Sequence, residues 1–237
     1  MHKIKTNFCL GLSKPLNILD TKIRKMINLS IENNLYFHIS ITYPLNFYFI
    51  KYLLRKKKRA KIKFISKILG DNMDNFRKSF KLTINKLGIK SLHIAQIVNL
   101  PILNPQKRKF DEINFIRFNE LIEETSLLKK TKTIEKLYLQ IFSADDYEFC
   151  TKIRKYFDGF AFYADLNNVY IKKDVYDFIL KNDVPCLILS IFGNPTETTE
   201  TNLHIKSYQF SQKRFSSNTI AVGRTKNLKR VKEIMAE

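Results

Sequence analysis

Short apolar segments alternate with amphipathic segments along the whole sequence, and this alternation limits the possible folds more than any other feature. Segments with strand character are 7–12, 35–39, 60–68, 91–98, 134–142, 159–164, 185–191 and 219–222. Segments with helical periodicity or capping residues follow them at 21–33, 45–54, 71–87, 111–128, 143–156, 175–180, 203–214 and 227–235. No hairpin signal separates the strands. Parallel strands need helical crossovers, so about eight such units predict an α/β fold, a closed (β/α)8 TIM barrel.

The length supports one domain. The chain has 237 residues, close to the typical size of such a barrel, and no stretch has the composition of a linker. We therefore expect a single barrel domain over residues 1–237 with shortened loops. A doubly wound open sheet is the alternative, but no Gly-rich fingerprint follows the first strand.

Composition indicates a globular intracellular protein. Hydrophobic residues make up 44% of the chain and can form a large core. No apolar run reaches the roughly 18 residues that cross a bilayer, and the N-terminus lacks the apolar stretch of a signal peptide. Cys9, Cys150 and Cys186 have neither metal-binding nor redox spacing. Reduced, buried cysteines favour a cytoplasmic location, and the four His residues give no metal site.

The net charge of +20 raises the question of nucleic-acid binding. Lys, Asn, Ile, Phe and Tyr are all abundant and Trp is absent, a pattern typical of AT-rich codon usage. The densest basic cluster, Arg55–Arg59 with Lys61, follows a predicted helix, where cations interact favourably with the helix dipole. We interpret it as a solvated helix end rather than a nucleic-acid site.

Several motifs follow the predicted strands in a recognisable order. Phe37–Pro44 reads FHISITYP, Lys67 ends KFISK, and His93–Val98 reads HIAQIV. LQIFSADDYEF, FAFYADL, LILSIFGNP and NTIAVGRTKNLKRVKEI follow at 139–149, 160–166, 187–195 and 218–234. In this order they resemble the motifs of the aldo-keto reductase family of NAD(P)H-dependent barrels. That family has F-D-T-A-x-x-Y-G near its second strand, a catalytic Lys ending the third, D-L-x-Q-x-H on the fourth, G-V-S-x-x-S-x-E-E-L at the fifth and Q-x-x-Y-N-L at the sixth.

The resemblance implies catalytic positions, of which this chain keeps two. The family's proton-donating Tyr corresponds to Tyr43, and the Lys that lowers its pKa corresponds to Lys67. The Asp that holds the Lys corresponds to His38, and the substrate-orienting His corresponds to Val98. His38 cannot supply a negative charge, and Val98 cannot donate a hydrogen bond to a carbonyl.

The resemblance also implies a cofactor site for NADP(H). Arg224, Thr225 and Lys226 lie between the eighth strand and the last helix, where barrels commonly bind phosphate. Gln140 and Asp165 stand where the family holds the nicotinamide amide. Of these, Asp165 can accept a hydrogen bond from that amide but cannot donate one as an Asn does.

These features lead to a first hypothesis and two alternatives. The first is a divergent aldo-keto reductase-like oxidoreductase that transfers hydride between NADP(H) and a small carbonyl or alcohol substrate, with Tyr43 and Lys67 as catalytic residues. The second is a catalytically inactive barrel of the same ancestry that acts as a binding or assembly module. The third is a nucleic-acid-associated protein that uses the Arg55–Lys61 cluster. The sequence indicates neither a membrane partner nor an oligomeric state.

Overall fold

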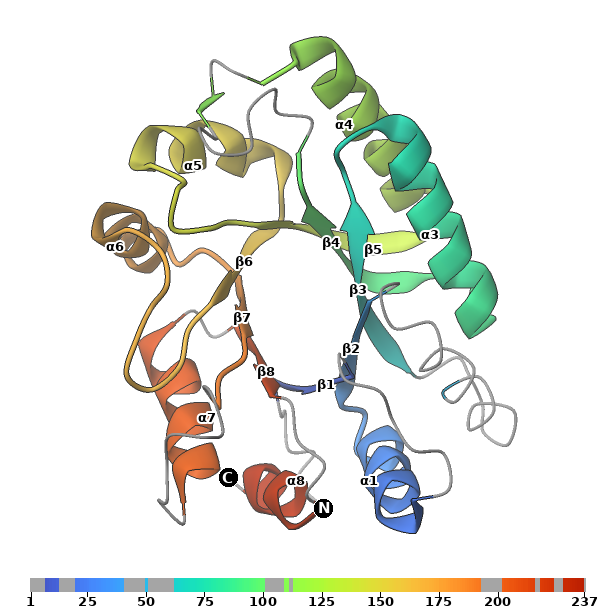
Figure 1. Cartoon of the computed structure of the whole chain (residues 1–237), viewed down its shortest axis with the longest axis vertical. Helices are drawn as coiled ribbons and strands as arrows, with labels where there is room; N and C mark the ends of the chain where they lie inside the picture. Colours follow the sequence, from blue (N-terminus) through green and yellow to red (C-terminus); the bar gives the residue numbers. More distant parts are fainter. Residues whose placement is uncertain are drawn as a thin grey trace.

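A computed structural model of the chain describes residues 7–12, 20–40, 50, 62–100, 109–110, 113–192, 202–215, 218–223 and 228–236. Eight parallel strands close into a barrel in the order of the sequence (Figure 1). They are β1 (Phe8–Gly11), β2 (Tyr36–Ser40), β3 (Lys63–Leu69), β4 (Leu92–Val98), β5 (Ile134–Gln140), β6 (Gly159–Tyr163), β7 (Cys186–Leu189) and β8 (Ile220–Gly223). The predicted (β/α)8 barrel is therefore confirmed.

Helices surround the barrel, with their labels as in Figure 1. They are α1 (Thr21–Glu32), α3 (Met73–Leu87), α4 (Phe115–Lys130), α5 (Tyr147–Ile153), the 3-10 turn η3 (Arg154–Tyr156), α6 (Lys173–Lys181), α7 (Leu203–Arg214) and α8 (Leu228–Ala236). Among these described segments, none combines the length and the apolar character of a membrane-spanning helix.

The sequence located most elements to within a few residues. The predicted helix 203–214 coincides with α7, whereas β3 begins three residues later than predicted, at Lys63. The predicted helix 45–54 lies outside the described residues, apart from Ile50. The predicted helix 143–156 begins later than expected, at Tyr147. Asp146 is itself the N-cap of α5, because its carboxylate accepts a hydrogen bond from the backbone N–H of Phe149.

Short polar residues begin the helices, and left-handed residues end them. N-cap side chains accept backbone hydrogen bonds at Asp20, Asn72, Asn114 and Asp146. The turn before β4 uses Gly88 with φ 64°, so α3 ends at Leu87, where the predicted helix 71–87 ends. Asn34, Lys132 and Asp183 take the same region, with φ 55°, 58° and 46°, before β2, β5 and β7. These turns reverse the chain at the amino end of the barrel.

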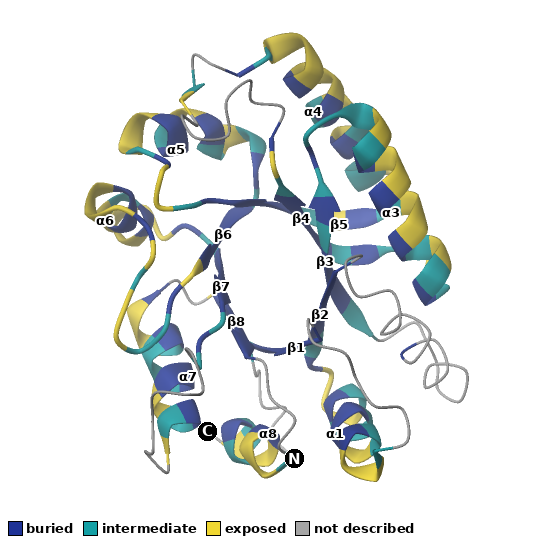
Figure 2. Cartoon of the chain, in the orientation of Figure 1, coloured by how far each residue is buried: buried dark blue, intermediate teal, exposed yellow. Residues whose placement is uncertain are grey.

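The core has two layers because successive strand side chains point to opposite faces. Between strands and helices lie large aromatic residues such as Phe37, Phe64 and Phe160. Inside the barrel lie Cys9, Ile65, Ile94, Tyr138, Ala161, Leu187, Leu189, Ile220 and Val222. Figure 2 shows the barrel wall as buried and the outer helix faces as exposed. The interior is thus packed with side chains, as in other barrels of this architecture.

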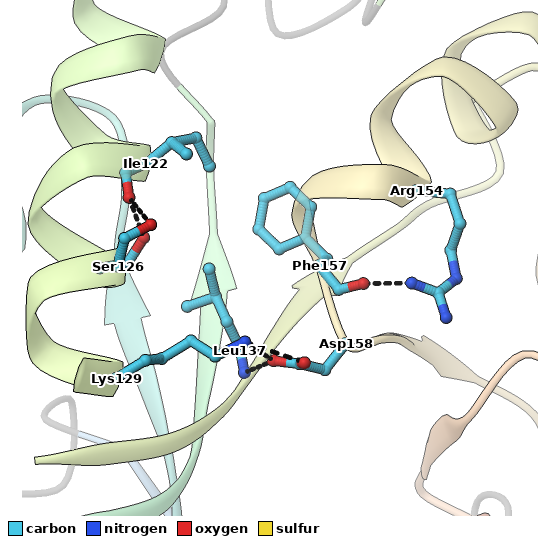
Figure 3. A network of polar contacts seen from close by, with 8 residues as sticks. Ile122, Ser126, Lys129, Leu137, Arg154, Phe157 and Asp158 are labelled. Carbon is cyan, nitrogen blue, oxygen red and sulfur yellow. Dashed lines mark hydrogen bonds and ion pairs between the residues drawn. The ribbon is translucent and has the colours of Figure 1, made fainter. Parts of the chain in front are cut away.

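A carboxylate joins α4 to the amino end of the barrel (Figure 3). The Asp158 oxygens accept hydrogen bonds from Lys129 Nζ at 2.9 and 2.7 Å and from the backbone N–H of Leu137 at 2.7 Å. Arg154 donates to the carbonyl of Phe157, the residue that precedes Asp158. The contacts fix the last turn of α4 against β5 and the start of β6.

Candidate active site at the carboxyl end of the barrel

The barrel interior changes from apolar to polar toward the carboxyl ends of the strands. Ile65 and Ile94 belong to the apolar interior. Because side chains alternate along a strand, Lys67 and Gln96, two residues further along, face the same way. On the opposite wall β7 and β8 keep Leu189 and Val222. The carboxyl end is therefore polar on one side and apolar on the other.

Three buried polar side chains form a chain of hydrogen bonds across the polar wall. His38 Nε2 lies 2.7 Å from Gln96 Oε1, and Gln96 Nε2 donates to Gln140 Oε1 at 2.7 Å. Their exposed fractions are 4%, 0% and 3%. Side chains from alternate strands share a layer in such barrels, so β2 contacts β4 across β3. We call this chain the amide relay.

The amide relay sets the tautomer of His38, and burial sets its protonation state. With the Gln96 carbonyl directed at it, His38 Nε2 donates the hydrogen bond, so Nδ1 carries the lone pair of the neutral ring. Burial and, second, the nearby charge of Lys67 lower the pKa of His38 to about 4, against the smaller opposing effect of its hydrogen bond to Gln96. His38 is thus neutral at physiological pH.

Lys67 is partly buried near the end of β3. It is the register partner of Ser40 on one side and of Gln96 on the other. Its Nζ lies 5.9 Å from the centre of the Tyr163 ring, which comes from β6. No carboxylate of the described residues lies within 4.0 Å of this ammonium group.

Of the residues predicted to bind cofactor, the structure describes Gln140 and Asp165, and the two side chains make different contacts. Gln140 joins His38 in the amide relay. Asp165 instead closes its own loop: Oδ1 accepts from the backbone N–H groups of Asn167 and Asn168 at 2.9 Å, and Oδ2 accepts from the Tyr170 hydroxyl at 3.0 Å. The Asp165 carboxylate is therefore engaged by the turn after β6.

The other predicted site residues lie outside the described part of the chain: Tyr43, Arg224, Thr225 and Lys226. Their places in the sequence are still informative. Tyr43 follows Ser40, the last residue of β2, by three residues. The three residues 224–226 connect Gly223 at the end of β8 to Leu228 at the start of α8.

Sequence reasoning missed two residues of this site. The sequence motifs place Gln96 on a strand without indicating a role, although it lies two residues after the buried Ile94. Tyr163 lies two residues after Ala161, which faces the interior. The period of two in β4 and β6 was the signal that could have placed both side chains on the inner wall.

Comparison with known proteins identifies the architecture. No protein-family model and no curated protein matches the sequence. Solved structures do match. An aldo-keto reductase of Brucella melitensis is 13% identical, with a TM-score of 0.68 over 96% of this chain and 87% of that one. The aldose reductase of Giardia lamblia is 11% identical, with a TM-score of 0.69 over 100% of this chain and 87% of that one.

A third match was solved with a nucleotide. An aldo-keto reductase of Klebsiella pneumoniae in complex with NADPH is 11% identical, with a TM-score of 0.67 over 97% of this chain and 84% of that one. The chain has the aldo-keto reductase fold. The resemblance predicted from the motifs is thereby confirmed for the fold. At this level of identity the aldo-keto reductase fold does not by itself settle the chemistry, which must be argued from the site.

Proposed function

We propose that this protein is a divergent, cytoplasmic aldo-keto reductase-like oxidoreductase that uses NADP(H) to reduce a small carbonyl compound or oxidise the corresponding alcohol. The observation that carries the proposal is the position of Lys67. It lies at the carboxyl end of β3, where enzymes with this barrel place catalytic groups, and it is the register partner of Ser40. Tyr43, the proposed acid, follows Ser40 by three residues.

The residues of this chain would supply acid catalysis. Tyr43 would donate its phenolic proton to the carbonyl oxygen, and the positive charge of Lys67 would favour the phenolate that remains. General acid catalysis of this kind typically contributes about 10²- to 10⁴-fold. The bound nicotinamide would supply the hydride. Because Val98 cannot hydrogen-bond a carbonyl, orientation of the substrate falls to other polar groups of this end.

The residues predicted to hold such a cofactor fit it in part. The Asp165 carboxylate already accepts three hydrogen bonds from its own loop, which leaves it little capacity to accept one from a nicotinamide amide. The connection from β8 to α8 fits better, because it contains Arg224, Thr225 and Lys226 where barrels commonly bind phosphate. Two cations there favour the 2′-phosphate of NADP(H). The structural neighbour from Klebsiella pneumoniae was solved with NADPH.

Fluorescence titration of the purified protein with NADPH tests the proposal, with NADH alongside. We expect saturable binding at micromolar NADPH, weakened at least tenfold in the Arg224→Ala, Lys226→Ala double variant. The matched control changes Lys229 and Arg230 to Ala, because both are exposed cations in the first turn of α8. Absence of binding up to millimolar cofactor would rule out hydride transfer.

A carbonyl screen then tests the assigned acid. Reduction of any aldehyde found should fall about 100-fold or more in Tyr43→Phe, but stay within twofold in Tyr147→Phe, which alters an exposed phenol on α5. The alternative, an inactive barrel that serves as a binding module, predicts neither cofactor binding nor any effect of Tyr43→Phe. Replacement of the family's Asp and His positions by His38 and Val98 is the observation that keeps it as a second candidate.

A further inference from the structure

Among the described residues, no carboxylate pairs with Lys67 at the carboxyl end of the barrel. Among the described residues of the eight strands, Glu135 is the one carboxylate. It is the second residue of β5, at the opposite end, and it pairs with His93 Nδ1 at 2.5 Å. The inner wall thus offers no negative charge near Lys67.

The carboxylates in the connections after the strands are engaged locally. After β3, Asp71 Oδ2 accepts from the Asn75 side chain at 2.7 Å, whereas Asp71 Oδ1 is buried without a hydrogen bond among the described residues. The carboxylate of Asp145, which is buried after β5, accepts from the backbone N–H of Phe142 at 2.8 Å, and Asp165 closes the turn after β6. None of them pairs with Lys67, and each already serves the fold of its own connection.

The rest of the sequence offers few further carboxylates. Segments 41–61, 101–108 and 224–227 follow β2, β4 and β8 and contain Lys and Arg but no Asp or Glu. The acidic residues outside the described part of the chain are Asp111, Glu112, Glu197, Glu200 and Glu237. Asp111 and Glu112 belong to the connection after β4, and Glu197 and Glu200 to the connection after β7. The segments that follow β2 and β8 can therefore add only positive charge.

His38 stands at the position of the family's Asp, but it is neutral and cannot offset the positive charge of Lys67. Its depressed pKa reflects burial first and the Lys67 charge second, and the amide relay holds its Nε2 on Gln96. A partly buried ammonium group loses hydration that only an anion or several acceptors can replace. An anionic ligand can therefore replace the hydration that the Lys67 ammonium group loses.

We propose that the carboxyl end of the barrel binds a carbonyl compound that also carries an oxyanion, a carboxylate or a phosphate, and that Lys67 pairs with this anion. The inference rests on the proposed function for the carbonyl but not for the anion. An ammonium group has three donors, so Lys67 can donate more than one hydrogen bond to the oxyanion. Tyr163, whose ring lies against Lys67, forms the opposite side of the anion site.

Paired substrates of one shape test the proposal. 4-Formylbenzoate carries the anion and its methyl ester lacks it, while glyceraldehyde 3-phosphate and glyceraldehyde form the second pair. We expect NADPH-dependent kcat/KM for an anionic compound to exceed that for its neutral partner by at least tenfold. A preference in either pair supports the proposal and identifies the oxyanion as carboxylate or phosphate. Equal rates in both pairs would overturn it and leave the proposed function intact.

Binding measured without turnover separates the two proposals. In calorimetry on the wild-type protein, 4-formylbenzoate should bind at least tenfold more tightly than its ester, and Lys67→Gln should abolish the difference. Lys63→Gln is the matched control, because it removes a cation from the amino end of the same strand, where Lys63 lies over the Tyr36 ring at 4.7 Å. An anion preference that survives Lys67→Gln would overturn the assignment to Lys67. Anion binding in a protein that binds no NADPH would support this inference while the proposed function fails.

His38→Asp is the second variant, since it supplies the missing negative charge from inside. The Gln96 and Gln140 amides can turn over to donate toward the new carboxylate, because their oxygen and nitrogen ends have nearly the same shape. Lys67 would then have a partner in the protein, and the anion preference should fall below threefold. Retention of a tenfold preference in a folded His38→Asp protein would overturn the role of the uncompensated charge.

Discussion

At the scale of single residues, His38 ties the stability of the barrel to pH. Its pKa is about 4 in the folded protein against the ordinary 6.5, so the folded state binds fewer protons than the unfolded state between these values. Stability is then present above about pH 6.5 and is lost as the pH falls toward 4. Between pH 7 and pH 5 the loss from this group should be about 2 kcal/mol.

Urea denaturation of wild type and His38→Gln at both pH values measures this contribution. His93 also has a pKa lowered by burial, so only the difference between the two proteins isolates His38. The variant should lose about 2 kcal/mol less than wild type on acidification. Parallel losses in both proteins would show that His38 is not buried in its neutral form.

Gln96 is the residue on which the amide relay depends. It is fully buried and hydrogen-bonded on both sides, to His38 and Gln140. Gln96→Leu leaves two buried polar groups without this partner and should lower the unfolding free energy by about 3 kcal/mol, since each costs about 1–3 kcal/mol. Adding Gln140→Leu removes one of the two side chains that lose Gln96 as a partner. The double variant should therefore lose less unfolding free energy than the two single variants lose in sum. Strict additivity of the two losses would show that the side chains are not coupled.

At the scale of elements, the contacts of Asp158 hold α4 to the barrel (Figure 3). Asp158→Ala removes the acceptor of the Leu137 N–H as well as the partner of Lys129, and it should cost about 2 kcal/mol, as for hydrogen bonds to charged groups. Lys129→Met should cost less, because the backbone contact survives. Glu148→Gln, which breaks an exposed pair with Lys152, serves as the control and should change stability by under about 0.5 kcal/mol. Equal effects of all three would show that the backbone contact contributes nothing.

Elements could be predicted from the sequence because their signals are local. Apolar period, N-cap residues and Gly88 lie within single segments, so β4, α7 and α8 were located to within one residue of their ends. Contacts between elements are not local. That His38 meets Gln96 depends on the stagger of β2, β3 and β4 in the closed barrel, which no single strand encodes. The occupation of Asp165 by its own loop likewise depends on a turn that the six-residue motif does not contain.

At the scale of the whole molecule, barrel closure links distant parts of the chain into one structure. β1 pairs with β8 as well as with β2, so residues near both ends of the sequence complete the wall. The three cysteines lie in separate parts of the barrel: Cys9 on β1, Cys150 in α5 and Cys186 on β7. None of the three forms a disulfide, and all are fully buried. Burial raises the pKa values of the Cys9 and Cys186 thiols, which further lowers their reactivity.

Thiol labelling during urea unfolding therefore tests whether the barrel opens as a unit. In native buffer all three cysteines should resist a soluble disulfide reagent for as long as the protein stays folded. Mass spectrometry of labelled peptides across a urea series should give three coincident midpoints that match the loss of helical circular dichroism, as two-state unfolding requires. Earlier labelling of Cys9 alone would mean that the β1–β8 seam opens by itself, and the barrel would then comprise more than one cooperative unit.

A Cys9→Ser variant, in which only Cys150 and Cys186 can be labelled, distinguishes seam opening from a fast-reacting residual population. With β1 intact in both proteins, the midpoints of these two cysteines must agree with those of wild type.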